Sequence, residues 1–380
     1  MKTDVLVVGG GATGAGVARD AAMRGLRTVL VERGALASGT TGKFHGQLHS
    51  GARYVVRDAT SARECVSESA ILRRIAPGYV DDTGGVFVLL PGDDPSYPER
   101  FLPACRAAGV AVEELDPAVV LRQEPGLARD VVRAFAVPDG ALDAVGLVGA
   151  CADSAAASGA RILTERPLTG LHVDAGRVVG GRLEDGSTLE AEVVVNAGGA
   201  WAASVAAMAG CRVPARLSKG VMVAVAGRLV HAVVSRCRLP ADGDILVPHG
   251  ASTIIGTTDT PVGDPDDAVA DGAAVRAMAA AGDELFPGFS SAGPVRAWAA
   301  VRPLVGVGAS EPGGRQVSRS HRVIDHGEHD GVAGLITVTG GKATTFRLMA
   351  EEAVDAVCAA LGSPRPCRTA LEELPGGSTL

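Results

Sequence analysis

Hydrophobic and polar residues alternate in blocks over the first thirty-three positions of the chain. After Asp4, residues 5–8 form a short run of valine and leucine, which is typical of a strand buried on both faces. A glycine-rich stretch follows at residues 9–14, and small residues at helical spacing continue to Gly25. A second apolar run covers residues 28–31 and ends at Glu32. This order predicts a strand–helix–strand unit with a glycine turn.

The glycine turn has the spacing G-x-G-x-x-G. Glycines at these positions let the backbone approach a pyrophosphate, which then lies at a helix N-terminus where unpaired N–H groups favour negative charge. An acidic residue at the end of the second strand is placed to accept hydrogen bonds from ribose hydroxyls. We expect these residues to bind a dinucleotide: Gly9, Gly11, Ala12, Thr13, Gly14, Glu32 and Arg33. A purely structural glycine turn is the alternative, and the spacing fits FAD and NAD equally.

The pattern past residue 33 divides the chain into interleaved segments. Residues 34–54 form a long connection rich in Gly, Ser and Thr, and such a loop inside a compact domain is usually functional. Residues 83–138 form a separate module, with a strand predicted at 86–90 and a helix at 98–108. A helix predicted at 143–158 returns the chain to the first domain.

The second half alternates short apolar runs with turns rich in Gly and Asp. Strands are predicted at residues 161–164, 168–173, 178–183, 193–195, 221–225, 231–235, 245–248, 253–257 and 335–338. Helices are predicted at residues 273–284 and 344–361. The closely spaced short strands between residues 217 and 330 indicate an antiparallel sheet.

These patterns predict an α/β protein in which a Rossmann-like dinucleotide-binding domain is interrupted by an α+β domain with an antiparallel sheet. The first domain is expected to be discontinuous and to comprise residues 1–80, 140–217 and 331–380. The inserted substrate-binding domain is expected to comprise residues 81–139 and 218–330.

Composition limits the function classes. The chain is 47% hydrophobic and 21% charged and has a net charge of −7, which argues against a nucleic-acid footprint. Its seven cysteines form no CxxC pair, so no metal or iron–sulfur site is expected, and scattered cysteines suit a reducing cytoplasm. The longest apolar stretch, residues 193–213, contains Asn196 and Ser204, and no transmembrane segment is predicted. We therefore expect a cytoplasmic protein, with peripheral association with a membrane left open.

Several ordered segments of the chain resemble one family of flavoproteins. They are VVGGGATGAGVARDAAMRGL (7–26), HSGARYVVRDATSARECVSE (49–68), VVNAGGAW (194–201), SRCRLPADGDILVP (235–248), IIGTTDT (254–260), VRPLV (301–305) and ITVTGGKATTFRLMAEEAVDAVC (336–358). In this order they resemble the FAD-dependent glycerol-3-phosphate dehydrogenases of the D-amino-acid-oxidase-like superfamily, most of all the A subunits of the bacterial anaerobic enzymes. The resemblance implies FAD as the cofactor.

The resemblance also implies where the flavin lies. The loop at 34–42 passes near it, the turn at 195–201 lies beside the dinucleotide, and the turn at 340–345 begins a helix at the pyrimidine end. A helix N-terminus and the charge of Lys342 would stabilise negative charge on reduced flavin there. The further cofactor residues implied are Thr40, Thr41, Gly42, Ala197, Gly198, Trp201, Gly340, Gly341, Lys342, Ala343 and Thr344.

The chain departs from the family pattern at several places. Lys43-Phe44 stands where the anaerobic enzymes have Arg-Asn, Trp298-Ala299 where the family has Tyr-Ser, and Phe346 where it has Tyr. These positions fall near the substrate side. The paired-cysteine C-terminal region of the anaerobic enzymes does not occur in the sequence. The electron acceptor therefore stays open between a quinone reached through a membrane partner, a soluble carrier and dioxygen.

A flavin dehydrogenase must hold the carbinol carbon against flavin N5, accept the hydroxyl proton and anchor the charged end of its substrate. His49 is the candidate base, since histidine titrates nearest to neutral pH, although a histidine that only packs against the flavin is the alternative. Arg302 and Lys342 are expected near the substrate oxygens. Family positions imply that Arg53 and Tyr54 bind substrate, and Arg319 is a candidate for the phosphate, with a solvated surface arginine as its alternative.

The sequence therefore predicts FAD-dependent oxidation of a secondary alcohol, with sn-glycerol 3-phosphate giving dihydroxyacetone phosphate as the default reaction. The runner-up is the same chemistry on a related polyol, sugar-like or phosphorylated alcohol. Further alternatives are an amine or amino-acid oxidase and a flavin-binding subunit without catalysis of its own. Two groups of residues are expected to be structural. A cluster in and before the segment at 325–331 could suggest a metal site but is expected to form a surface turn: His321, His326 and His329 with Asp325 and Glu328. Asp259 is expected to fix a turn through its own backbone hydrogen bonds.

Overall fold

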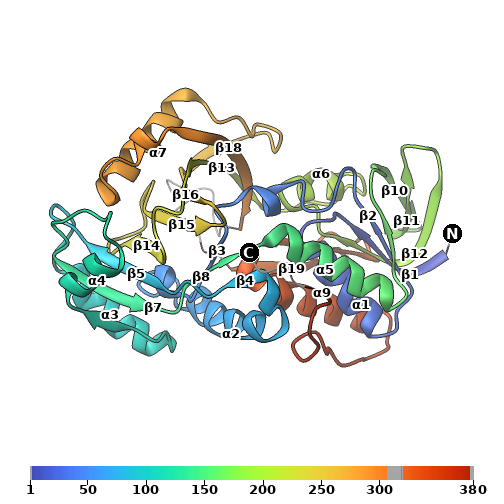
Figure 1. The fold of residues 1–380 in the computed structure, drawn as a ribbon. Helices are drawn as coiled ribbons and strands as arrows, with labels where there is room; N and C mark the ends of the chain where they lie inside the picture. The colour runs from blue at the N-terminus through green and yellow to red at the C-terminus, as the bar shows by residue number, and fades with distance from the viewer. Residues whose placement is uncertain (1, 306–317, 319, 377–380) are drawn as a thin grey trace.

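The computed structural model describes residues 2–305, 318 and 320–376, which form two large sheets and one small sheet with helices packed against them. In Figure 1 the eight-stranded sheet lies on the right with helices α1, α5 and α9, and the nine-stranded sheet lies on the left with α3, α4 and α7. The N-terminal third of the chain runs through both halves, so the two halves are joined by several chain crossings (Figure 1).

The eight-stranded sheet has a parallel centre and antiparallel margins. The parallel strands are β1 (Lys2–Val8), β2 (Thr28–Val31), β9 (Arg161–Leu163), β12 (Thr188–Asn196) and β20 (Leu335–Gly340). The antiparallel strands are β10 (Leu168–Asp174), β11 (Arg177–Leu183) and β19 (His321–Asp325). Because parallel strands end at the same edge, the turns that follow β1, β12 and β20 lie together there.

Three helices cover this sheet: α1 (Ala12–Met23), α5 (Ala144–Ala157) and α9 (Phe346–Ala360). Val17 of α1 and Val354 of α9 are fully buried against Val5 and Val193 in one hydrophobic cluster. Leu6 and Val194, on the opposite face, are buried in a second cluster. Burial of both faces explains why β1 and β2 are continuous apolar runs rather than alternating ones.

The nine-stranded sheet is antiparallel except where β5 pairs with β14 in parallel. Its strands are β5 (Gly85–Leu89), β6 (Glu113–Leu115), β7 (Arg133–Val137), β13 (Arg216–Ala226), β14 (Val233–Arg236), β15 (Ile245–His249), β16 (Ser252–Gly256), β17 (Thr260–Val262) and β18 (Pro294–Leu304). The helices α3 (Tyr97–Ala108), α4 (Pro117–Gln123) and α7 (Gly272–Leu285) pack against it.

Shorter elements connect the two large sheets. A small sheet joins β3 (Gln47–Leu48), β4 (Val80–Asp81) and β8 (Gly140–Leu142), next to helix α2 (Ala59–Ile75). The described residues also form the helices α6 (Ala202–Ala207) and α8 (His326–His329). Their 3-10 turns are η1 (Thr40–Lys43), η2 (Ala52–Tyr54), η3 (Pro77–Tyr79), η4 (Gly199–Trp201), η5 (Ser290–Ala292) and η7 (Ala343–Thr345).

The predicted α/β architecture, a Rossmann-like unit combined with a mainly antiparallel second sheet, is confirmed. The domain boundaries stay a prediction; β19 lies inside the range expected for the inserted domain, yet it pairs with β20 of the eight-stranded sheet. The predicted surface turn at 325–331 is wrong for one residue. His326 is fully buried in α8, and its Nε2 lies 2.8 Å from Oγ1 of Thr337 on β20.

Candidate active site

The glycine turn between β1 and α1 is too tight for side chains. Gly9 has a φ of 111°, and a Cβ placed on it would lie 2.6 Å from the carbonyl oxygen of Ala197. A Cβ on Gly14 would lie 1.8 Å from the carbonyl oxygen of Gly9. The first turn of α1 therefore presents bare backbone N–H groups at the sheet edge, apart from that of Ala12, which donates to Thr41 Oγ1 at 3.1 Å.

The carboxylate of Glu32 is held beside this turn at the end of β2. Its oxygens accept the backbone N–H groups of Gly10 at 2.6 Å and Gly34 at 2.9 Å. Next to it, the guanidinium of Arg33 stacks 4.0 Å from the centre of a Trp201 ring, and Asp266 accepts hydrogen bonds from both side chains. Residues predicted from separate segments to bind the dinucleotide thus converge at one edge of the sheet.

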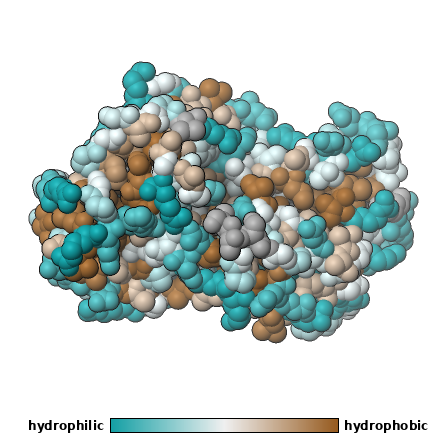
Figure 2. Space-filling model, viewed as in Figure 1, coloured by the Kyte–Doolittle hydropathy of each residue, from teal (hydrophilic) through white to brown (hydrophobic). Residues whose placement is uncertain are grey.

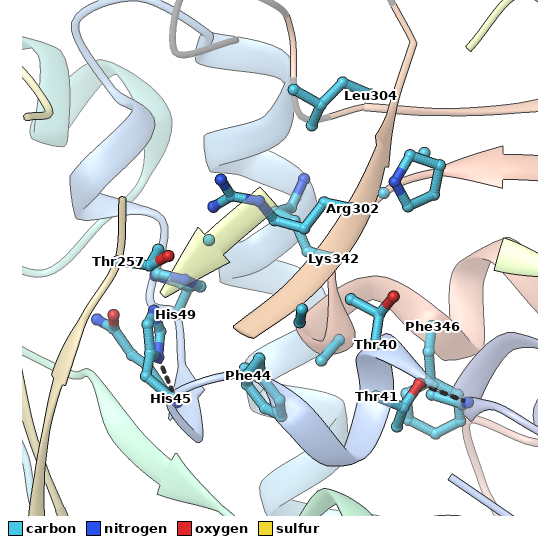
Figure 3. Close-up of a pocket in the computed structure, with 18 of the residues that line it drawn as sticks. Thr40, Thr41, Phe44, His45, His49, Thr257, Arg302, Leu304, Lys342 and Phe346 are labelled. Atoms are coloured by element: carbon cyan, nitrogen blue, oxygen red, sulfur yellow. Dashed lines mark hydrogen bonds between the residues drawn. The ribbon is translucent and has the colours of Figure 1, made fainter. Parts of the chain in front are cut away.

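A cavity of about 390 Å³ opens between the two large sheets (Figure 3). Its lining includes all but one of the residues predicted for catalysis and substrate binding: His49, Arg53, Tyr54, Arg302 and Lys342. It also includes predicted cofactor residues, namely Ala12, Thr13, Thr40, Thr41, Gly340, Gly341 and Ala343. The exception, Arg319, lies outside the described residues. The structure therefore brings the N-terminal loop, β18 and η7 together around one space.

His49 follows the short strand β3 and is fixed from two sides. Its backbone N–H donates to Thr344 Oγ1 at 3.1 Å. Its ring packs edge-on against the ring of Tyr54, with centroids 5.2 Å apart, and against that of His45, at 6.0 Å. The imidazole thus faces the cavity in a defined orientation (Figure 3).

Lys342 lies at the start of η7, directly after β20 and its two glycines. Its ammonium group is 3.3 Å from a carboxylate oxygen of Glu64, and the side chain is only 5% exposed. It also lies 5.4 Å from the centre of the Tyr54 ring. Glu64, on helix α2, was not among the predicted site residues, since a glutamate on a polar helix face carries no local signal.

Arg302 enters the cavity from β18, opposite Ser218 on β13. Its guanidinium donates to Ser218 Oγ at 2.9 Å, to the Thr258 carbonyl oxygen at 2.9 Å and to Asp259 at 3.1 Å. The expectation that Asp259 fixes a turn through its own backbone bonds is therefore wrong, because its carboxylate instead holds Arg302 and the Ser218 hydroxyl. The Arg302 side chain is 21% exposed and is only partly buried.

Arg53 belongs to a buried charge network on the other side of the cavity. It lies 3.3 Å from Asp244, whose carboxylate is fully buried and also pairs with Arg238 at 2.8 Å. Such pairing keeps a buried arginine in one orientation.

His45 and Gln47 are among the polar residues of the cavity that the sequence reasoning missed. Burial lowers the pKa of His45 to about 3, and the charges of Arg53 and Arg302 act in the same direction. Gln47 donates to Asp139 at 2.9 Å, and Asp139 also accepts the backbone N–H of Ser50. The only available signal was the position of His45 on the same functional loop as His49.

The family model described as FAD dependent oxidoreductase (DAO) matches residues 4–354. The chain belongs to this family. The predictions of an oxidoreductase and of FAD rather than NAD are thereby confirmed. FAD also fits the residues present: the side-chain-free turn at Gly9 and Gly14, the open end of α1 and the acidic Glu32 are suited to a dinucleotide.

Relatives and solved structures agree with this assignment. The chain is 45% identical over 383 residues to the A subunit of the anaerobic glycerol-3-phosphate dehydrogenase of Escherichia coli, covering 99% of this chain and 70% of that protein. It is similar to the FAD complex of glycerol-3-phosphate dehydrogenase from Bacillus halodurans, with 27% identity, a TM-score of 0.75, and coverage of 99% of this chain and 68% of that one. Glycine oxidase from Geobacillus kaustophilus, at 23% identity and a TM-score of 0.79 with 98% of each chain covered, shares the fold.

Outside the cavity, Cys211, His326 and Asp330 bring potential metal ligands within 4.8 Å of one another. Both ring nitrogens of His326 already interact with other side chains, one with Asp330 and one with Thr337.

No helix in the described part of the chain is long and apolar enough to cross a membrane. On the face shown in Figure 2, hydrophilic residues follow the outline of both halves and hydrophobic residues lie among them.

Proposed function

We propose that the protein oxidises the secondary hydroxyl of sn-glycerol 3-phosphate and gives dihydroxyacetone phosphate, with FAD as the cofactor. One observation carries the proposal: a candidate base, His49, shares a single cavity with Arg53, Arg302 and Lys342, at the edge of the sheet that carries the dinucleotide turn. The likeness to a relative named as part of a glycerol-3-phosphate dehydrogenase supports the substrate.

The charges around the cavity favour an anionic substrate. Arg57 lines it as well, so four cationic side chains face the space, while Asp244, Asp259 and Glu64 hold three of them in place. Burial lowers the pKa of the nearby His45, and the positive charges of Arg53 and Arg302 act in the same direction. A phosphate group would be attracted and oriented by such a set of donors.

In this proposal His49 accepts the proton of the hydroxyl group that is oxidised. Arg302 and Lys342 stabilise the negative charge that builds on the same oxygen as the proton leaves. FAD, when bound, supplies the acceptor for the hydride from the carbinol carbon. Arg302 comes from β18 and Lys342 from the turn before η7, and both line the cavity, so the two cations together would orient the substrate before reaction.

A related phosphorylated alcohol or polyol is the second candidate. Phe44 lines the cavity at a position where the chain departs from the family pattern, and its ring adds apolar surface there. An alcohol with more carbon atoms than glycerol would use that surface. The electron acceptor is proposed only as a class: a quinone reached through a partner, a soluble carrier or dioxygen.

The direct test is anaerobic reduction. We would mix purified, FAD-loaded protein with sn-glycerol 3-phosphate and follow the visible absorption band of oxidised flavin. Rapid bleaching is expected with this compound, and none with glycerol, which lacks the phosphate. Bleaching by a larger phosphorylated alcohol but not by sn-glycerol 3-phosphate would favour the second candidate. A protein that stays yellow with every phosphorylated alcohol would contradict both.

A further inference from the structure

His45 is a second histidine in the cavity, and the reaction proposed above makes no use of it. It lies between η1 and β3, is 8% exposed and lines the same space as His49. The two imidazole centres are 6.0 Å apart and the rings meet edge to face. Figure 3 shows the His45 ring beside His49 and Thr257.

The backbone determines which nitrogen of His45 carries the proton. The N–H group of Gln47 donates to His45 Nδ1 at 3.1 Å, so Nδ1 is the acceptor and the ring proton lies on Nε2. Among the described residues the hydrogen bond of the His45 ring is the one at Nδ1, and no protein acceptor is paired with the Nε2–H group. The His45 side chain is only 8% exposed and lines the cavity, so a ligand that displaces solvent there is the group that can accept from Nε2–H.

The surroundings keep this imidazole neutral. Burial is the largest cause, and the charges of Arg53 and Arg302 act in the same direction, so that the pKa of His45 is lowered to about 3. The other titratable groups around the cavity are His49, Tyr54, Arg57, Asp58 and Lys342. A histidine that does not protonate in the physiological range is a poor base but a dependable hydrogen-bond donor.

We propose that the Nε2–H group of His45 donates a hydrogen bond to the oxygen on the carbon that is oxidised, while His49 takes up the proton from that oxygen. This inference rests on the proposed function. The donor is fixed before substrate binds, so it needs no reorganisation when negative charge develops on the oxygen. The two histidines then have different tasks: His45 binds the oxygen throughout, and His49 changes its protonation state.

Two substitutions separate the donor from the rest of the side chain. In His45→Gln the amide nitrogen reaches close to the position of Nε2, and in His45→Leu the donor is lost at similar size. We expect His45→Leu to lower kcat by about 10²–10³-fold with little change in KM and with FAD still bound, because the lost interaction is strongest in the transition state. His45→Gln should stay within about tenfold of the wild type. His231→Leu, at an exposed histidine, is the matched control and should be unaffected.

The pH profile of kcat/KM assigns the base. The limb that reports loss of the base at low pH should persist in His45→Gln and disappear in His49→Gln. Loss of this limb in His45→Gln, or a kcat for His45→Leu within threefold of the wild type, would overturn the proposal.

Nitrogen-15 NMR of histidine-labelled protein tests the state of His45 without any substrate, and it remains informative if His45→Leu fails to fold. We expect one neutral tautomer, protonated at Nε2, from pH 5 to pH 9. A proton on Nδ1, or titration within that range, overturns the His45 proposal whatever the substrate is. Failure of sn-glycerol 3-phosphate to bleach the wild-type flavin contradicts the proposed function instead, so the two failures are distinguishable.

Discussion

The backbone N–H of His49 donates to Thr344 Oγ1 over 3.1 Å, although the two residues are 295 positions apart in the chain. Thr344 is fully buried in η7, at the turn that also presents Lys342. This hydrogen bond joins the loop with the candidate base to the turn with the candidate cation. The relative position of the two side chains is therefore set by a contact between main chain and side chain, not by either loop alone.

Substitution of Thr344 tests how much this contact stabilises the protein. In Thr344→Val the shape is kept, but the hydroxyl that accepts from the His49 N–H group is lost. We expect the free energy of unfolding to fall by about 1–3 kcal/mol. Thr344→Ser keeps the hydroxyl and is the matched control. Urea unfolding measures both, and a valine variant as stable as the serine variant would show that the hydrogen bond contributes little.

The Glu64–Lys342 pair predicts opposite shifts of the flavin reduction potential. Lys342→Met removes a positive charge that would stabilise reduced flavin, so the midpoint potential should fall. Glu64→Gln removes the counter-charge 3.3 Å from that ammonium, so the potential should rise. We expect at least a tenfold change in the equilibrium constant in each case, which is about 30 mV for two electrons.

The control for this prediction is Glu113→Gln, an exposed charge on β6 that should leave the potential unchanged. Dye-coupled reductive titration gives the midpoint without any alcohol substrate. Shifts of the same sign in Glu64→Gln and Lys342→Met would contradict the assignment of the pair to the flavin.

Arg302 and Asp259 form the second pair that a variant can separate. Arg302→Ala should abolish turnover while FAD remains bound, because its guanidinium faces the cavity from β18. Asp259→Asn keeps the size of the side chain but weakens the charge-assisted bond that orients Arg302, and should lower kcat/KM by about tenfold or more. Stopped-flow bleaching and the flavin spectrum measure the two effects. Arg322→Ala, at an exposed arginine, is the control, and unchanged turnover in Arg302→Ala would remove that residue from the site.

The glycine turn predicts different outcomes at two neighbouring glycines. A Cβ at Gly14 would lie 1.8 Å from the carbonyl oxygen of Gly9, so Gly14→Ala should misfold or be colourless. At Gly11 the nearest atom would be Thr41 Oγ1 at 3.1 Å, so Gly11→Ala should fold, whereas Gly11→Leu should be colourless because the larger side chain enters the space predicted for the pyrophosphate. The flavin content per chain decides this. Full flavin loading of Gly14→Ala would contradict the prediction.

The parts of the fold that sequence reasoning predicted are those with local patterns. The β1–α1–β2 unit is such a case, since its apolar runs, glycine turn and final acid are contiguous in the chain. The strand β18 was not predicted, because it combines prolines, arginines and alanines without alternation and is defined by its pairing with β13. A pattern within one segment cannot report such a partner.

In the candidate site, too, local sequence patterns predicted some residues, whereas contacts between distant segments were missed. The resemblance to a family pointed to His49 and Lys342, but their partners Thr344 and Glu64 come from distant segments. The neutral state of His45 depends on its burial and on the backbone N–H of Gln47, neither of which can be predicted from neighbouring residue types.

The last prediction concerns how His45 affects the stability of the folded protein at acidic pH. Its pKa is about 3 in the folded protein, through burial first and then through Arg53 and Arg302, and near 6.5 in an unfolded chain. Between these values the unfolded state binds a proton that the folded state does not, so the free energy of unfolding decreases as the pH falls below 6.5. In His45→Gln this contribution is absent, and the variant should gain about 2 kcal/mol relative to the wild type between pH 7 and pH 5. Urea unfolding at pH 7, 6 and 5, with free FAD held constant, measures the difference. Parallel pH dependences for the two proteins would show that His45 protonates as readily in the folded state as in the unfolded one.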